Sequence, residues 1–219
     1  MGLLDFNALA QQCAPQVAPS TLTAIVRTES DFNPYAIGVV GGRLVRQPSS
    51  AAEAVATARE LERHGWNYSV GLAQVNRSNF ARYGLTADTA FEPCRNLMVG
   101  AAILAHCFET ASTVALQVQQ ALRAGLSCYG SGDFVTGYRT GYVQRVVGNA
   151  SARPVPVVPA IEFGIVPTVT PIPVVPLEAT GTAGQFRRQI EAQGQRASVP
   201  TDRPEDRKQD PPDSSAVVF

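Results

Sequence analysis

The chain has 219 residues, with 18 basic and 18 acidic side chains that leave no net charge. The charges are balanced on both sides of residue 150, so no region offers the basic surface that nucleic acid binding needs. No apolar run reaches membrane-spanning length, and the N-terminus lacks the basic and apolar regions of a secretory signal. We therefore expect no nucleic acid partner, no membrane span and no recognisable signal peptide.

Prolines and cysteines divide the chain unevenly, because 11 of the 16 prolines follow Ala150 and all four cysteines precede it. The prolines of residues 153–176 are too closely spaced for a helix and favour an extended spacer. Residues 177–219 are polar and charged and are not expected to fold alone. The sequence thus predicts a folded domain over residues 1–150, and a proline-rich spacer with a disordered polar tail over residues 151–219. Removing the tail is expected to leave the domain folded and active.

Helical patterns dominate residues 1–150. In chain order, helices are expected from Asp5 to Gln12, from a Ser20 N-cap to Ser30, from a Ser50 N-cap to Gly65, from Arg77 to Tyr83, across Leu97–Phe108 after Pro93, across Val118–Tyr129, and from Tyr142 to Val147. Strand signals are nearly absent. We therefore expect an all-α class, with a small irregular or β-like lobe between Gly38 and Gln47.

Glu29 is an acid at a position where the pattern predicts core. Leu22, Ile25 and Val26 form an apolar helical stripe, and Glu29 is its next member at the same spacing. Burial disfavours a charged carboxylate, and so do the free carbonyl groups of a helix that ends before Pro34. We therefore expect Glu29 to hold its proton near neutral pH, as a general acid does. The alternative is a glutamate that caps or pairs at the helix end.

The four cysteines are disulfide candidates rather than metal ligands. They are Cys13, Cys94, Cys107 and Cys128. Their spacings match no zinc site, and neither His64 nor His106 is placed to complete one, so no metal is expected. Disulfides in an oxidising compartment fit the pattern, whereas free buried thiols would indicate a cytosolic protein.

Helix geometry limits the disulfide pairings. Cys94 and Cys107 flank one helix and lie about 20 Å apart along it, so they do not pair with each other. If the next helix returns antiparallel, it places Cys128 near Cys94. We therefore expect the bond Cys94–Cys128, with Cys13–Cys107 as the second. The rival is Cys13–Cys94 with Cys107–Cys128.

Four short motifs and a closing pair carry a family resemblance. They are Glu29-Ser30-Asp31-Phe32-Asn33-Pro34-Tyr35-Ala36, Gly71-Leu72-Ala73-Gln74, Asn96-Leu97-Met98-Val99-Gly100 with Leu104, Ser127-Cys128-Tyr129-Gly130-Ser131-Gly132, and Tyr142-Val143. In this order they resemble the soluble lytic transglycosylase family, which has a goose-type-lysozyme-like fold. Within that family the chain is similar to the transglycosylase component of bacterial type IV secretion systems. The resemblance covers about residues 5–148.

The resemblance implies a set of site residues. Glu29 would be the catalytic acid and base, Gln74 and Tyr129 would line the sugar cleft, Ser30 and Ser69 would neighbour it, and Asn76 would be a subsite contact at a position where the family often has methionine. Without the resemblance, Gln74 could instead satisfy buried backbone groups, and Tyr129 could be a core residue. The turn at Tyr129 departs from the family at Cys128, Gly130 and Ser131.

The absence of a second acid near Glu29 favours a substrate-assisted mechanism, because Asp31 should face away from it. The resemblance then implies cleavage of the bond between N-acetylmuramic acid and N-acetylglucosamine in peptidoglycan, with a 1,6-anhydro product and no cofactor. A hydrolase of the same fold and a peptidoglycan-binding scaffold are the alternatives. Expected partners are glycan strands and, through the tail, envelope components of a secretion apparatus, which places the protein in the periplasm.

Overall fold

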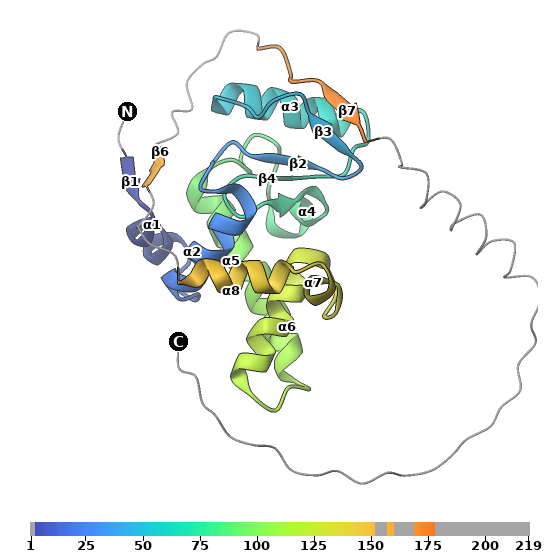
Figure 1. Cartoon of the computed structure of the whole chain (residues 1–219). Coiled ribbons are helices and arrows are strands. Elements are labelled where there is room, and N and C mark those ends of the chain that lie inside the picture. Colours follow the sequence, from blue (N-terminus) through green and yellow to red (C-terminus); the bar gives the residue numbers. More distant parts are fainter. Residues whose placement is uncertain (1–2, 152–156, 160–168, 178–219) are drawn as a thin grey trace, which may run out of the picture. The chain divides into compact units, whose positions relative to one another are not determined.

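A computed structural model of the protein describes residues 3–151, 157–159 and 169–177 (Figure 1). The described elements are β1 (Leu3–Asp5), α1 (Phe6–Cys13), α2 (Pro19–Ser30), β2 (Ile37–Val39), β3 (Gly42–Leu44), α3 (Ala51–Arg63), β4 (Tyr68–Val70), β5 (Val75–Asn76), the 3₁₀ turn η1 (Arg77–Asn79), α4 (Phe80–Tyr83), α5 (Pro93–Ser112), α6 (Val118–Ser131), α7 (Thr136–Arg139), α8 (Tyr142–Ala150), β6 (Val157–Pro159) and β7 (Val174–Pro176). They all lie within one compact unit, Met1–Leu177. The expected all-α class is confirmed, since each described strand has only two or three residues.

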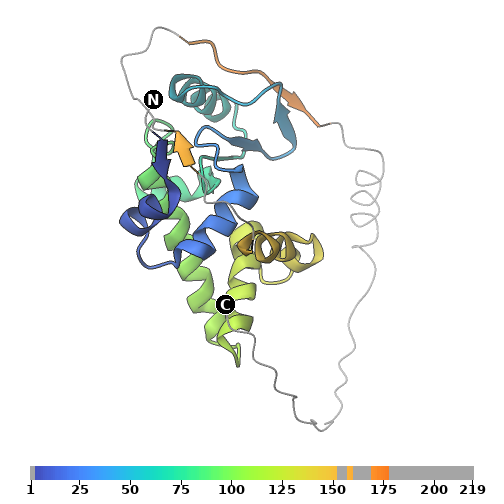
Figure 2. The ribbon, with the colours of Figure 1, turned by 60° about the vertical axis from the view of Figure 1, so that its left-hand side comes forward.

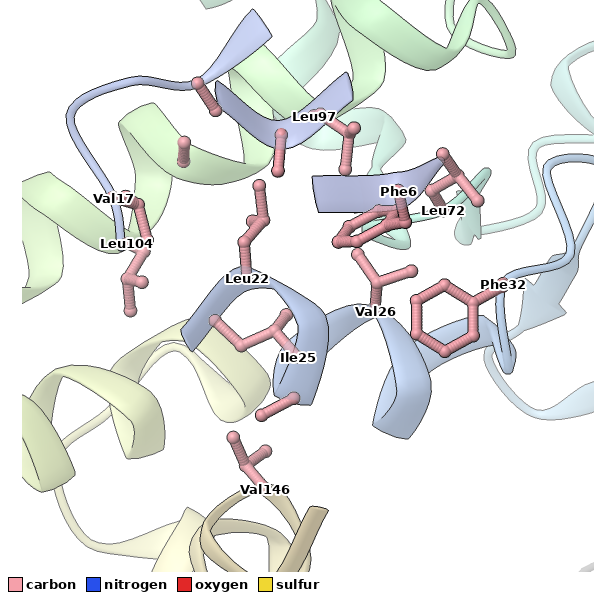
Figure 3. Packing of buried hydrophobic residues seen from close by; sticks show 14 of the residues in the cluster. Phe6, Val17, Leu22, Ile25, Val26, Phe32, Leu72, Leu97, Leu104 and Val146 are labelled. Atoms are coloured by element: carbon pink, nitrogen blue, oxygen red, sulfur yellow. The ribbon is translucent and has the colours of Figure 1, made fainter. Parts of the chain in front are cut away.

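The first of two apolar cores lies among the long helices. The predicted stripe of α2 enters it, because Leu22, Ile25 and Val26 are all almost completely buried. They pack with Phe6 of α1 and Leu97 of α5 (Figure 3). A fully buried aliphatic or aromatic side chain contributes about 1.5–3 kcal/mol. The position of α2, and with it the position of Glu29 at its end, is therefore set by this core.

The second core lies under the small sheet and α3. The sheet order is β2-β4-β5, with Ile37 opposite Val70 and Val70 opposite Val75. These three side chains point into the core, where Tyr68 and Leu61 are also buried. Because successive strand residues face opposite sides, the residues between them face away from the core. That second face of the sheet forms part of the site described below.

Most helix boundaries lie close to the predicted ones. Ser50 caps α3, with its hydroxyl accepting a hydrogen bond from the Glu53 amide at 3.2 Å. Gly132 ends α6 in the left-handed conformation. The expected Ser20 N-cap is wrong, because Pro19 occupies the first turn and Ala18 precedes it. The β-like lobe expected between Gly38 and Gln47 is present as the short strands β2 and β3, which pair with β4 and β7 and not with each other.

Two stretches of the expected spacer pack against the domain. β6 pairs antiparallel with β1, and β7 pairs antiparallel with β3, as both views show (Figure 1 and Figure 2). Val158 is fully buried in the first core, and Ile172 is buried in the second. These two stretches lie beyond the domain boundary expected at residue 150 and belong to the same compact unit as the helices. The disorder expected for the polar tail concerns residues 178–219, which lie outside the described residues.

The disulfides follow the rival pairing. Cys13 is bonded to Cys94 and Cys107 to Cys128, with Cα–Cα distances of 5.1 Å and 5.7 Å. The expected Cys94–Cys128 bond is wrong because α6 is too short. Cys128 lies ten residues into α6, about 15 Å along its axis, whereas Cys94 lies about 27 Å from the end of α5. Cys107, which is closer to the turn between the helices, is the cysteine that Cys128 reaches.

A chain ending at Ser151 should be less stable than a chain ending at Leu177. The shorter chain loses the burial of Val158 and Ile172 and exposes the apolar surface beneath them. We expect its melting temperature to fall by roughly 5 °C or more, measured by circular dichroism. The chain ending at Leu177 should have the same melting temperature as the full-length protein. Equal melting of all three would contradict the packing of β6 and β7.

Candidate active site

A cleft of about 790 Å³ lies between the helices and the small sheet. Its lining includes Glu29 from α2, Gly38, Val39 and Val40 from β2 and the link to β3, Asn67, Ser69, Gln74, Asn76, Ser78 and Asn79 from the β4–β5 region, Ile103, His106 and Cys107 from α5, and Cys128, Tyr129 and Gly130 from α6. Gly38, Ser69 and Asn76 are register partners across the sheet, on the face opposite the core. His106, which the sequence analysis considered only as a metal ligand and rejected, also lines the cleft.

Glu29 is half-buried and lines the cleft at the end of α2. Burial raises the pKa of Glu29 from 4.5 to about 7, while a hydrogen bond from Tyr142 and the charge of Arg145 oppose this rise. The expected upward shift is therefore confirmed, and burial is its cause. Asp31 is exposed beyond the helix end, as expected. Among the described residues of the cleft lining, Glu29 carries the only carboxylate.

Tyr142 holds the Glu29 carboxyl group in place. Its hydroxyl donates to Glu29 Oε1 at 2.5 Å, from the first residue of α8. The Arg145 guanidinium lies 6.0 Å from the Tyr142 ring centroid. Gly130 makes room for the ring, because a Cβ atom built at this position would lie 2.6 Å from Tyr142 Cε1. Sequence reasoning recorded Tyr142 only as part of a closing motif and missed its contact with Glu29.

The turn between β4 and β5 places Gln74 in the cleft. The Gln74 side-chain amide donates to the carbonyl groups of Ala36 and Gly71, both at 3.0 Å. Gln74 thus satisfies backbone groups, as the alternative interpretation held, and it lines the cleft as well. Fully buried Asn96 holds the same turn, because its Oδ1 accepts from the Ala73 amide at 2.7 Å.

Tyr129 reaches the same turn from α6. Its hydroxyl donates to the Ala73 carbonyl at 2.6 Å, and its ring packs against the first core while lining the cleft. Burial, followed by the nearby charge of Glu29, raises the pKa of Tyr129 well above its usual value. Tyr129 is therefore a neutral hydrogen-bonding group beside Glu29, and it is partly a core residue.

The remaining predicted residues surround this centre. Asn76 Nδ2 donates to Asn67 Oδ1 at 2.9 Å and to Ser69 Oγ at 3.2 Å, so the three side chains form a polar row in the cleft. Ser30 differs from them. Its hydroxyl donates to the Leu72 carbonyl at 2.8 Å, which ties α2 to the β4–β5 turn.

No described residues form a cluster of three or more histidine, cysteine, aspartate or glutamate side chains that could hold a metal ion. Within the described part of the chain, no helix is both long enough and apolar enough to cross a membrane. The described cleft lining offers the Glu29 carboxyl group, which Tyr142 holds, together with His106 and the amide and hydroxyl groups of the other polar side chains.

Comparisons with known proteins identify the family of the chain. The family model described as "Transglycosylase SLT domain" matches residues 6–134. A protein named type IV secretion system protein virB1, from Brucella suis biovar 1 (strain 1330), is 54% identical over 167 residues, which cover 73% of this chain and 70% of that protein. Protein virB1 from Agrobacterium fabrum is 40% identical over 148 residues, which cover 67% of this chain and 59% of that protein. No solved structure matches the chain significantly.

These matches place the protein in an enzyme class, the lytic transglycosylases. Specifically, the chain belongs to the transglycosylase SLT domain family, whose matched region contains Glu29, Gln74, Asn96 and Tyr129. This membership confirms the family and enzyme class expected from the four motifs. The matched region ends before Tyr142, which the structure adds to the site.

The raised pKa of Glu29 predicts a pH-dependent stability difference. The folded protein binds the Glu29 proton more tightly than the unfolded chain, so the stability gained is complete below about pH 4.5 and is lost as pH rises through about 7. Glu29→Gln cannot ionise. Its melting temperature relative to wild type should therefore rise between pH 4.5 and 7. A difference that stays constant over this range would contradict the raised pKa.

Glu53→Gln provides a control, because the pKa of Glu53 is shifted in the opposite direction from that of Glu29. The side-chain hydrogen bond from Arg46, followed by those from Ser49, lowers the pKa of Glu53 to about 2. The stability that ionised Glu53 provides is present above about pH 4.5 and is lost as pH falls through about 2. Glu53→Gln should therefore be less stable than wild type at neutral pH, and the difference should shrink in acid.

Tyr142→Phe should impair catalysis while keeping the ring. The free energy that such a hydrogen bond to an ionisable group contributes corresponds to a roughly tenfold change in rate, so peptidoglycan cleavage should slow by about that factor. This hydrogen bond lowers the pKa of Glu29, so its loss should raise that pKa. The limb of the pH–rate profile that reports ionisation of Glu29 should therefore move to higher pH. The control is Tyr138→Phe, at an exposed tyrosine on α7. An unchanged rate and profile in Tyr142→Phe would remove Tyr142 from the site.

Proposed function

We propose that this protein cleaves the bond between N-acetylmuramic acid and N-acetylglucosamine in peptidoglycan, with Glu29 as acid and then base, and releases a 1,6-anhydro product. The observation that carries the proposal is the half-buried carboxyl group of Glu29, whose pKa burial raises to about 7 and which is the only carboxyl group among the described residues that line the cleft. A carboxyl group with this pKa is partly protonated at neutral pH, so it can both donate a proton and recover one.

The absence of a second carboxylate from the described cleft lining supports substrate assistance. In this mechanism Glu29 protonates the glycosidic oxygen, and the C–O bond to the anomeric carbon breaks. The acetamido oxygen of the same sugar closes on that carbon to give an oxazolinium intermediate. Ionised Glu29 then removes a proton from the 6-hydroxyl group, which attacks the anomeric carbon and opens the oxazolinium ring.

The polar side chains of the cleft lining support glycan binding. Ser69, Gln74 and Asn76 place uncharged donors and acceptors along one side of the cleft, and Tyr129 adds a hydroxyl group near Glu29. Sugar hydroxyl and acetamido groups pair well with such side chains. We assign these four residues to substrate binding, with Ser30 as a neighbour that holds the turn on which Gln74 lies.

The cellular role follows from the relatives and the disulfides. Both relatives described above carry the name virB1, and the Brucella suis protein is named as a type IV secretion system protein. We infer that this protein opens peptidoglycan locally for such an apparatus in the periplasm, with envelope components as partners of its C-terminal tail. Two disulfide bonds in the structure support an oxidising compartment.

Glu29→Gln tests the chemistry. The amide is nearly isosteric but cannot transfer a proton, so the rate of glycan release from purified sacculi should fall by roughly 1,000-fold or more, while the variant stays folded. The mass of the wild-type product separates lytic transglycosylation from hydrolysis, because a 1,6-anhydro product is lighter by one water. Hydrated reducing ends would refute the proposed product. A rate above about a tenth of wild type in Glu29→Gln would refute the role of Glu29.

A further inference from the structure

The segment over residues 169–177, here called the strap, is anchored in the second core. Ile172 is only 4% exposed, and its backbone amide donates to Thr57 Oγ1 at 3.0 Å. Thr57 is fully buried in α3, so this hydrogen bond satisfies a hydroxyl group that water does not reach. The strap is therefore held to α3 by both apolar burial and a buried polar contact.

The strap also pairs with β3, which follows the cleft-lining residues Val39 and Val40 in the chain. Arg43 of β3 is opposite Val175 of β7, and the Leu177 amide donates to the Gly41 carbonyl at 3.0 Å. In both ribbon views β7 lies alongside β3 (Figure 1 and Figure 2). The strap thus pairs with β3, whereas β4 pairs with β2, the strand that precedes β3 in the chain.

A close contact connects the strap to the cleft lining. A Cβ atom built at Gly42 would lie 3.0 Å from Val174 Cγ1, 3.2 Å from Trp66 Cζ3 and 3.3 Å from Val39 Cγ1. The strap residue Val174 and the cleft residue Val39 thus pack around the same glycine. Because tightly packed interiors leave few voids, a displaced Val174 would leave Val39 without support on this side.

We propose that the strap is a positioning element of the glycan cleft, which holds Val39 and Val40 in place and so sets the affinity for the glycan. The proposal rests on the proposed function for the identity of the ligand. Glu29 and Tyr142 lie on α2 and α8, which belong to the other core. Loss of the strap contact should therefore weaken glycan binding and leave the chemical step nearly unchanged.

Ile172→Ala in the full-length chain tests the proposal, with Val175→Ala as the matched control. Both are aliphatic residues of the strap, but Val175 is 38% exposed and points away from the core. With purified glycan strands, Ile172→Ala should raise KM by roughly three- to tenfold and change kcat by less than about twofold. Val175→Ala should leave both constants unchanged. An unchanged KM in folded Ile172→Ala, or an equal rise in both variants, would overturn the proposal.

Amide hydrogen exchange provides a readout that needs no glycan. The amide of Val40 donates to the Asn67 carbonyl at 2.9 Å, and exchange at Val39 and Val40 should accelerate in Ile172→Ala but not in Val175→Ala. Equal acceleration throughout α2 and α5 would indicate general loss of stability and would overturn the positioning role. If Glu29→Gln keeps its activity, the proposed chemistry fails, while this exchange result still decides the role of the strap.

Thr57→Val is the second variant, for use if Ile172→Ala does not fold. It removes the acceptor of the Ile172 amide and nearly keeps the shape of the side chain. We expect the same changes in KM and exchange, in the same direction and smaller. A folded Thr57→Val with wild-type KM and wild-type exchange at Val39 and Val40 would overturn the proposal.

Discussion

The site depends on how the turn at Gly71–Gln74 is held. Ser30 of α2 and Tyr129 of α6 each donate a hydrogen bond to a carbonyl group of this turn, and Asn96 of α5 accepts one from its backbone. Asn96 is fully buried and also donates to two further carbonyl groups, so each broken contact would leave a buried polar group unpaired at a cost of about 1–3 kcal/mol. Four separate sequence motifs thus meet at one turn, which explains why they occur together.

Features with a local cause could be predicted from the sequence. The position of Glu29 follows from helical periodicity, because Leu22, Ile25 and Val26 fix which face of α2 is buried. Once that face is known, simple electrostatics gives the direction of the pKa shift. The N-cap at Ser50 and the ends of helices at glycine residues could also be predicted, because both depend only on neighbouring residues in the chain. Three-residue strands such as β4 were missed, because so few residues cannot display a period of two.

Features that depend on distant contacts could not be predicted. Tyr142 lies 113 residues from Glu29 in the chain, and nothing in its own sequence neighbourhood marks it as a partner of an acid. The predicted disulfide pairing was wrong for a related reason. It depended on how far α5 and α6 are shifted relative to each other along their axes, which their lengths determine only approximately. The packing of the strap could not be predicted from composition. Closely spaced prolines exclude a helix, but they do not indicate whether the resulting extended segment packs on a core.

The contact between Gly130 and the Tyr142 ring constrains how this site can evolve. A side chain at position 130 would occupy the space of the ring that holds Glu29, so most single substitutions there would displace the tyrosine. Conversely, a smaller residue at position 142 would lift the restriction on position 130 but leave Glu29 without its hydrogen bond. The two positions are therefore expected to change together among related sequences, although they lie on different helices and neither is an acid or a base.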